Sequence, residues 1–324
     1  MGDKSTIEWT DATWNVVVGC TRVSAGCAKC YAFSLHDMRH MAFMEGKKLP
    51  QQYAKPFKEV QIFPDRLDMP LKWKRPRKIF VNSLSDLFHE KVPIEFIEQV
   101  FEIMALAKHH TFQILTKRPK RMKEFFDKCN YNGHLLGNEP LPNVWLGVSV
   151  EDQKAADERI PSLLQTPAAI RFLSCEPLLG LVDLNHIQID SAIVIDSLKG
   201  VRHVIEYKEH QFPHPKVDWI IVGGESGHGA RPMHPEWARS LRDQCQAAGV
   251  SYFFKQWGEW APIGEHNFMK HEMRMIGIDG VNYSEHKKED IPCTTEFMLK
   301  VGKHKAGRML DGLEWNEFPI VKNP

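Results

Sequence analysis

The stretch that decides the fold is WNVVVGCTRVSAGCAKCY, residues 14–31. An apolar run, Trp14 to Val18, leads into Cys20, Cys27 and Cys30, so three of the seven cysteines lie within eleven residues. A tight turn brings two thiols three positions apart to the same side, and a glycine-containing loop lets the third close over them. Three thiolates are one fewer than a closed structural zinc site uses. The loop is therefore predicted to bind a metal centre that keeps one position open.

The composition limits the classes of protein to consider. With 324 residues, 43% of them apolar, the chain can bury a large core in one barrel-sized domain or in two smaller ones. Its 42 Lys and Arg against 41 Asp and Glu give a net charge of +1, so nucleic-acid binding would require a local basic patch. No apolar stretch is long enough to span a membrane, and the polar N-terminus lacks the apolar segment of a signal peptide, so we expect a cytoplasmic protein. Clustered cysteines in a reducing compartment are more typical of metal binding than of disulfides.

Short apolar, β-rich runs recur along the chain, each followed by polar residues. They begin at Val16 and recur at 79–81, 111–115, 144–148, 170–173, 219–222 and 252–254. Helical patterns fill four of the intervals, at 94–107, 120–129, 153–164 and 237–248. Near-continuous apolar strands of this kind suit a parallel sheet covered on both faces. We predict an α/β fold, a parallel (β/α) barrel, complete or partial, of about seven strands. An open doubly wound sheet is the alternative.

Two regions interrupt this alternation, at about 181–218 and 265–307. The first adds Ile- and Val-rich sequence and a polar, His-containing stretch. The second holds a possible hairpin at 273–283 around Asp279-Gly280 and a charged segment. We expect both to be insertions in a single domain that covers 1–324 and carries a C-terminal extension from about 260.

Polar residues gather where the predicted strands end, which is the working face of either fold. They are Asp86, Lys117, Glu151, Glu176, Glu225 and Lys255. Loops are polar in general, so exposure explains any one of these residues about as well as function does. The joint pattern is the stronger signal.

A three-cysteine loop after the first strand of a (β/α) barrel resembles the radical S-adenosylmethionine (SAM) enzymes. Several motifs also resemble the phage-associated three-cysteine-motif family of unknown function, which is similar to radical SAM enzymes of the spore photoproduct lyase type. These motifs are WTDATWN (9–15), FVNSLSDLF (80–88), LTKRP (115–119), GVSVE (147–151), LSCEPLLG (173–180), GGESG (223–227) and AGRMLDG (306–312). The resemblance covers nearly the whole chain.

The resemblance implies that Cys20, Cys27 and Cys30 hold a [4Fe-4S] cluster, with the amino and carboxylate groups of SAM on the fourth iron. Cleavage of SAM would give a deoxyadenosyl radical that abstracts hydrogen from a substrate. The chain departs from the usual C-x3-C-x2-C pattern, because its first gap has six residues. Lys29 stands where the family carries an aromatic residue, and Tyr31, one place after Cys30, is the nearest aromatic and the candidate for the contact with SAM that the resemblance implies there.

The same resemblance implies further contacts to SAM. By position, Ser83 and Asp86 would meet its amino group, and Ser149 and Glu151 its carboxylate or ribose. The family's Gly-Gly-Glu-like motif follows the second strand, whereas in this chain Gly223-Gly224-Glu225 follows the sixth run.

Other strand-end residues are candidates for catalysis or substrate binding. Cys175, beside Glu176, could donate a hydrogen atom, the role a cysteine takes in the lyase-type relatives, or could be a small buried hydrophobe. Lys117 and Arg118 could hold a phosphate or carboxylate, or could be solvated charges at a helix start. Glu225 and Arg231 flank a glycine-rich segment that permits close approach of a ligand.

A nucleotide or a base in DNA, undergoing modification or repair, is the expected substrate class. It rests on the resemblance and on two basic runs, at 72–78 and 303–308. A reductant such as flavodoxin or ferredoxin and a separately encoded partner protein are possible partners. The alternative from another class is a zinc-stabilised nucleic-acid-binding protein without catalysis, with His36 or His40 as the fourth ligand.

Overall fold

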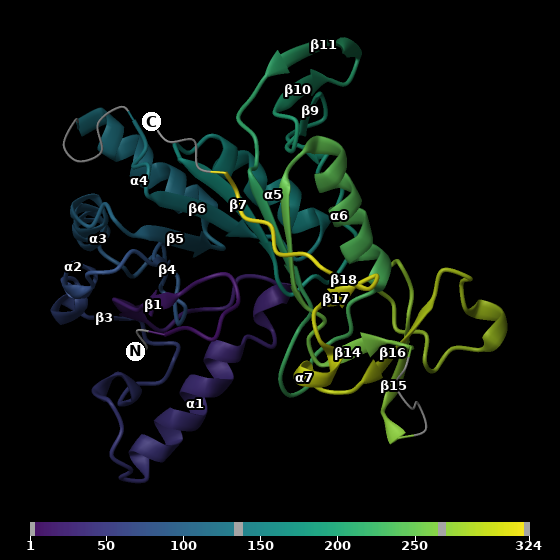
Figure 1. The fold of residues 1–324 in the computed structure, drawn as a ribbon, viewed down its shortest axis with the longest axis horizontal. Helices are drawn as coiled ribbons and strands as arrows, with labels where there is room; N and C mark the ends of the chain where they lie inside the picture. The colour runs from purple at the N-terminus through teal and green to yellow at the C-terminus, as the bar shows by residue number, and fades with distance from the viewer. Residues whose placement is uncertain (1–3, 133–138, 265–269, 321–324) are drawn as a thin grey trace. The chain divides into compact units, whose positions relative to one another are not determined.

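The main sheet of the computed structural model, which describes residues 4–132, 139–264 and 270–320, has seven strands. In spatial order they are β1 (Ala12–Trp14), β4 (Lys78–Val81), β5 (Thr111–Thr116), β6 (Val144–Ser149), β7 (Ile170–Cys175), β12 (Trp219–Gly223) and β13 (Ser251–Gln256). The pairs β1·β4, β4·β5, β5·β6, β7·β12 and β12·β13 are parallel (Figure 1). The spatial order follows the chain order, whereas a doubly wound sheet reverses its order at a switch point. The fold is therefore α/β with a partial (β/α) barrel, as predicted, and the doubly wound alternative is excluded.

The chain divides into two compact units, residues 1–148 with 162–171 and residues 149–161 with 172–324. Helix α5 (Gln153–Leu164) contributes residues to both. Each unit is described by itself.

Besides its strands and the end of α5, the described residues of the first unit form four α-helices. They are α1 (Tyr31–Met44), α2 (Met69–Lys72), α3 (Ile94–Leu106) and α4 (Pro119–Asn132). Pro119 is the first residue of α4, where a missing backbone N–H costs nothing. Aromatic rings form much of the core, since Phe101 lies 5.2 Å from Phe125 and Trp14 5.7 Å from Phe112.

The first strand differs from the prediction. We predicted that it opens at Val16, but β1 ends at Trp14, which pairs with Val81. The valines that follow form β2 (Val17–Val18), which pairs antiparallel with β3 (Gln61–Ile62) outside the main sheet. The reason is Asn15, whose side-chain Oδ1 accepts hydrogen bonds from Ser83 Oγ and Leu84 N and so draws the chain away from the sheet.

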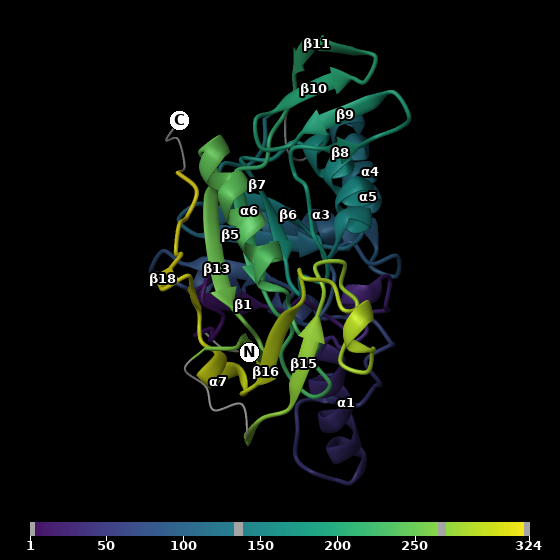
Figure 2. The same cartoon turned by 90° about the vertical axis from the view of Figure 1, so that its right-hand side faces the viewer.

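The second unit carries α6 (Pro235–Ala248) along β12 and β13 (Figure 2). The helix was predicted at 237–248, and it begins two residues earlier. Pro235 stands at its first turn, and Gly249 ends it in the left-handed conformation, φ 64°.

Both predicted insertions lie in the second unit. The first forms a separate antiparallel sheet of β8 (Ile187–Gln188), β9 (Ile193–Asp196), β10 (Val201–Val204) and β11 (Tyr207–Pro213), seen in Figure 2. The second includes β15 (Met273–Ile276), which pairs with β16 (Glu296–Lys300), and β16 also pairs with β14 (Trp260–Pro262). The remaining elements are α7 (Lys303–Ala306), β17 (Met309–Leu310) and β18 (Leu313–Glu314). Residues 265–269 lie outside the described part of the chain.

The predicted turn at Asp279-Gly280 is present. Gly280 has a φ of 83°, and Gly277 N donates to Val281 O at 2.9 Å. On either side of the turn, Ile276 and Asn282 form an isolated antiparallel β-bridge.

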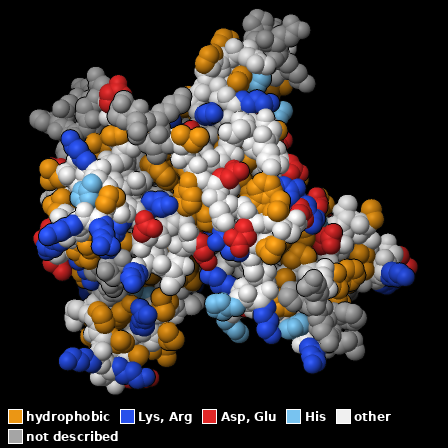
Figure 3. Space-filling model, viewed as in Figure 1, with side chains coloured by type: hydrophobic (Ala, Val, Ile, Leu, Met, Phe, Trp, Pro, Cys, Tyr) orange, Lys and Arg blue, Asp and Glu red, His pale blue; other side chains and the backbone are white. Residues whose placement is uncertain are grey.

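The surface mixes the two signs of charge, as the net charge of +1 implies. Figure 3 shows Lys and Arg side chains interspersed with Asp and Glu over one face. Within the described residues, no helix is long and apolar enough to cross a membrane.

Candidate functional site

The three-cysteine loop begins at a sharp bend beside the ends of two strands. Gly19 has a φ of 101°, and a Cβ there would lie 2.5 Å from the carbonyl oxygen of Glu59, so only glycine fits. Gly19 also bridges Ser85 in parallel, which places the loop at the carboxyl end of β4. Cys20 N then donates to Phe57 O at 2.9 Å.

The cysteines occupy three different local environments. Cys20 is partly exposed, and Cys27, which ends a short 3-10 turn and lies 3.8 Å from Ser24 Oγ, is buried. Cys30 is the N-cap residue of α1 and is partly exposed. None of the three forms a disulfide.

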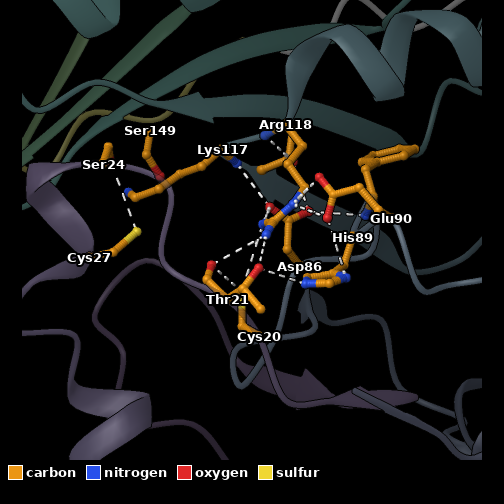
Figure 4. Close-up of polar contacts among 12 residues, drawn as sticks. Cys20, Thr21, Ser24, Cys27, Asp86, His89, Glu90, Lys117, Arg118 and Ser149 are labelled. Carbon is orange, nitrogen blue, oxygen red and sulfur yellow. Dashed lines mark hydrogen bonds and ion pairs between the residues drawn. The ribbon is translucent and has the colours of Figure 1, made fainter. Parts of the chain in front are cut away.

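Arg118 ties the loop to the strand ends (Figure 4). Its Nη1 donates to Cys20 Sγ at 3.7 Å, and its Nη2 donates to the hydroxyl and the carbonyl oxygen of Thr21 at 2.9 and 3.2 Å. The Nε of Arg118 faces Glu90 at 2.9 Å, and His89 Nε2 lies 2.9 Å from the Thr21 hydroxyl. Arg118 is 7% exposed, so a predicted candidate for anion binding proves to be a buried residue in contact with the cysteine loop.

Asp86 holds Arg118 in place. One carboxylate oxygen accepts from Thr116 Oγ1 at 2.7 Å and Phe88 N at 3.0 Å, and the other accepts from Lys117 N at 3.0 Å and Arg118 Nη1 at 3.1 Å. Four donors and 5% exposure leave this carboxylate little capacity for a ligand. Asp86 was predicted to meet the SAM amino group, and in this structure its carboxylate positions Arg118.

The electrostatics of Arg118 and Cys20 follow from this contact. Burial alone would lower the pKa of Arg118, but Asp86, Cys20 and Glu90 together raise it, so it is a permanent cation. Burial raises the pKa of the Cys20 thiol to about 11, with Asp86 adding to the rise and Arg118 opposing it. Binding of a metal at Cys20 must therefore release a proton from Sγ.

Tyr31 and Ser83, two predicted SAM contacts, are joined to each other. The Tyr31 hydroxyl donates to the Ser83 carbonyl oxygen at 2.7 Å, and the Ser83 hydroxyl donates to Asn15 Oδ1 at 3.2 Å. Tyr31 is 52% exposed, so its ring remains accessible beside Cys30.

The two histidines predicted as a fourth zinc ligand have backbone partners, and the loop thiols are not gathered around one point. A zinc ion brings its ligands to within about 4 Å of one another. Across the described residues, no three His, Cys, Asp or Glu side chains are gathered to hold one ion. The predicted fourth zinc ligands are also engaged, because His36 Nε2 lies 2.9 Å from Lys55 O and His40 Nδ1 lies 2.8 Å from Tyr53 O. In a cluster each thiolate binds a different iron, so the thiols need not converge on one ion.

In the second unit, Glu151 has an arginine partner that the sequence did not reveal. Arg159, two turns along α5, donates to Glu151 Oε2 and to the Ser149 carbonyl oxygen, both at 2.8 Å. Glu151 and Arg159 are 1% and 3% exposed. Burial of this pair gives Glu151 a role in holding α5 against the end of β6.

Glu225 and Arg231, two predicted substrate contacts, bind each other. Arg231 donates from its backbone N, Nε and Nη2 to the Glu225 carboxylate at 2.6–2.9 Å. The neighbouring glycines allow other parts of the chain to pack closely against them. A Cβ on Gly224 would lie 1.9 Å from the carbonyl oxygen of Trp257. One on Gly223 would lie 2.6 Å from a carboxylate oxygen of Glu176. The glycine-rich segment is thus explained by close packing of the chain.

Cys175 and Glu176 differ sharply in accessibility. Cys175 is fully buried at the end of β7. Glu176 forms an ion pair with Lys255 Nζ at 3.0 Å, and its side chain is 14% exposed. The pair leaves one Glu176 oxygen and two Lys255 hydrogens for other partners, more capacity than Asp86 retains.

Sequence reasoning missed the residues that complete these networks. Thr21 and Thr116 lie inside quoted motifs but were given no role, and His89, Glu90 and Arg159 lie outside them. One local signal was present, because Thr116 directly precedes the Lys117-Arg118 pair.

The chain was compared with protein families, with curated proteins and with solved structures. Neither the curated proteins nor the solved structures gave a match. A family described as "Protein of unknown function (DUF5131)" matches residues 4–319. The chain belongs to this DUF5131 family.

Proposed function

We propose that the protein is a radical SAM-type enzyme in which Cys20, Cys27 and Cys30 hold a [4Fe-4S] cluster. The observation that carries the proposal is the cysteine loop itself. Three cysteines without disulfides lie on one loop at the carboxyl end of β4, and Cys20 Sγ is held by a buried guanidinium. This is the face at which (β/α) barrels carry their active sites.

When bound, such a cluster supplies the electron that cleaves SAM to a radical. The chain's own residues orient the ligands and set their charge. Arg118 donates to Cys20 Sγ at 3.7 Å, and a hydrogen bond from a cation to a ligating sulfur raises the reduction potential of a cluster. Asp86 fixes Arg118, so its part in the proposal is positional.

The remaining predicted SAM contacts fall into two groups. Tyr31 and Ser83, beside the cysteines, have an accessible ring and a backbone held in place, which suits contact with a ligand. Ser149 and Glu151 are both buried and both accept hydrogen bonds from Arg159. Glu151 could reach a ligand only by giving up Arg159, so we assign it a structural part.

For the substrate we propose a nucleotide or a base in DNA. The basic run at 72–78 supports this, because Lys72, Lys74 and Arg75 are exposed and the Arg77 guanidinium lies 5.0 Å from the centre of the Trp73 ring. Cys175, shielded from solvent, remains a proposed hydrogen-atom donor. A small one-electron carrier such as flavodoxin or ferredoxin would supply the electron, and a separately encoded protein could complete the substrate site.

The test is anaerobic purification and reconstitution, followed by iron and sulfide analysis and electron paramagnetic resonance of the dithionite-reduced protein with and without SAM. We expect about four irons and four sulfides per chain and a spectrum that SAM perturbs. The triple variant C20A/C27A/C30A should lose iron and SAM cleavage, whereas Cys293→Ala, an exposed cysteine outside the loop, should keep both. Unchanged iron and SAM cleavage in the triple variant, or one zinc and no iron in the native protein, would refute the proposal.

A further inference from the structure

A second site lies in the first unit, in a cavity of about 410 Å³ beside α1. It is lined by Arg39, Leu49, Pro50, Gln52, Tyr53 and Arg66. Two of these residues are cations and none is acidic. The sequence analysis singled out none of them.

Arg66 is held rigidly at the cavity. Its guanidinium lies 3.7 Å over the Phe63 ring, and it donates from Nη1 to Asn15 O and from Nη2 to Gln52 Oε1, both at 3.0 Å. These bonds use two of its five N–H groups. No carboxylate in the described part of the chain forms an ion pair with it.

Arg39 reaches the cavity from α1. Its Nη1 donates to the Tyr53 hydroxyl, and its guanidinium lies 5.3 Å from the centre of the Tyr53 ring. Tyr53 is itself fixed, because it is 4% exposed, its carbonyl oxygen binds His40 Nδ1, and its ring packs 5.1 Å from His36. Arg39 likewise has no acidic partner among the described residues, and it keeps four N–H groups for a ligand.

Arg39 and Arg66 are both partly buried, and both keep N–H groups that an anion in the cavity could accept from. Burial lowers the pKa of Arg66, and the charge of the exposed Asp65 offsets this only in part. Figure 3 shows Lys and Arg side chains among hydrophobic ones over α1.

We propose that this cavity binds a phosphate group carried by a ligand of nucleotide size. Guanidinium groups match the geometry of phosphate oxygens, and Arg39 and Arg66 offer donors from two sides. Leu49 and Pro50 give an apolar wall for the rest of the ligand, and the volume is in the range of small-molecule sites. The phosphate could come from a free nucleotide or from a nucleic-acid strand.

The site does not depend on the proposed cluster. Arg39 is nine residues past Cys30 on the same helix, roughly 13 Å along its axis, so the two sites share α1 but no residue. Loss of phosphate binding would leave iron content unchanged, and loss of iron would leave phosphate binding unchanged.

The test uses the full chain and calorimetric titration with adenosine 5′-monophosphate, inorganic phosphate and adenosine. We expect the monophosphate to bind about tenfold or more tightly than adenosine, and Arg39→Gln to weaken it about tenfold or more. Arg202→Gln removes one positive charge from the exposed surface of β10, so it is the matched control and should bind like the native chain. Arg66→Gln should also weaken binding. Because Arg66 donates hydrogen bonds to Asn15 and Gln52, its substitution could unfold the protein, and in that case the result for Arg39→Gln decides.

A labelled single-stranded DNA distinguishes the two sources of phosphate. Tight binding of the strand that adenosine monophosphate displaces, and that Arg39→Gln weakens, identifies a strand phosphate as the ligand. Binding of the mononucleotide without the strand identifies a free nucleotide. Absence of binding by all the phosphate probes, or equal binding by native protein and Arg39→Gln, overturns the proposal.

Discussion

The guanidinium of Arg118 joins Cys20 Sγ, at 3.7 Å, to a carboxylate oxygen of Asp86, at 3.1 Å. Through this contact the cysteine loop is attached by a side-chain network to the ends of β4 and β5. A group bound at Cys20 would meet a positive charge that the fold holds in place. The same network makes the loop depend on a pair of buried charges for its position.

Breaking that pair should destabilise the protein. Arg118→Met leaves the buried Asp86 carboxylate without its cation, and we expect it to lower the free energy of unfolding by about 3 kcal/mol. Asp86→Asn should cost less, because Arg118 keeps its ion pair with Glu90. The double variant should lose less than the sum, because the two residues interact. Urea unfolding measures all three. Lys72→Met, in an exposed pair with Asp68, is the control and should cost less than about 1 kcal/mol. Additive losses would contradict the coupling.

At the first proposed site, the sequence singled out residues that the structure brings together, but it did not reveal the contacts between them. The C-x6-C-x2-C spacing and the polar residues after each strand are local patterns, and Asp86, Lys117 and Arg118 do lie together. The contact between Arg118 and Cys20 joins residues 98 positions apart. Such a contact depends on tertiary structure, which no local pattern encodes.

The strand-end carboxylates illustrate the same limit. Glu151 and Glu225 looked available for ligands, because their arginine partners stand six to eight residues away with no distinctive spacing. Both carboxylates are buried, and a buried ionised side chain needs a partner, so each is paired with an arginine and is not free to bind a ligand. For the fold, hydrophobic runs located six of the seven strands of the main sheet. The first strand was misplaced, because the hydrogen bonds of Asn15 draw the chain away from the main sheet and Val17–Val18 form a strand that pairs with β3 instead.

Close packing at the end of β12 predicts a severe effect of one methyl group. In Gly224→Ala the new Cβ would lie 1.9 Å from the backbone oxygen of Trp257, so the backbone must shift, and we expect a loss of more than about 2 kcal/mol. Gly264→Ala adds a methyl group 3.9 Å from its nearest neighbour and should cost less than about 1 kcal/mol. Thermal unfolding of both variants compares them. Similar melting temperatures would show that the Gly224 contact can relax.

His234 should make the protein less stable in mild acid. Its side chain is 1% exposed, Nδ1 accepts from Glu236 N, and Nε2 lies 2.9 Å from Thr294 O. Burial lowers the pKa of His234 below that of the unfolded chain, so the unfolded state binds the proton first. The free energy of unfolding is therefore not reduced by this group above a pH of about 6.5, and it falls as the pH drops below that value.

His234→Asn removes the titration, and asparagine can still cap α6. Between pH 7.5 and 5.5 the variant should lose less unfolding free energy than the native chain, as urea unfolding at the two pH values would show. His304→Asn, at an exposed position, is the control and should follow the native chain. An equal loss in His234→Asn would assign the acid sensitivity to other buried histidines, among them His110, whose pKa burial also lowers.

The proposed cluster predicts which thiols are protected on loading with iron. In the metal-free chain Cys293 is exposed and should be alkylated first, Cys20 and Cys30 are partly exposed and should follow, and Cys175 and Cys245 are fully buried and should react only after unfolding. Reconstitution with iron and sulfide places the loop thiols on metal, so peptide mapping by mass spectrometry should show Cys20 and Cys30 protected while Cys293 reacts as before.

This pattern separates a specific cluster from iron bound at random. Adventitious iron would bind the most accessible thiol, so protection of Cys293 to the same degree as Cys20 and Cys30 would contradict a site at the loop. Arg118→Gln provides a finer test, because Cys20 loses its guanidinium partner while Cys30 keeps its place at the start of α1. Protection of Cys20 should then fall more than protection of Cys30. Equal protection of both in this variant would mean that Arg118 does not act through Cys20.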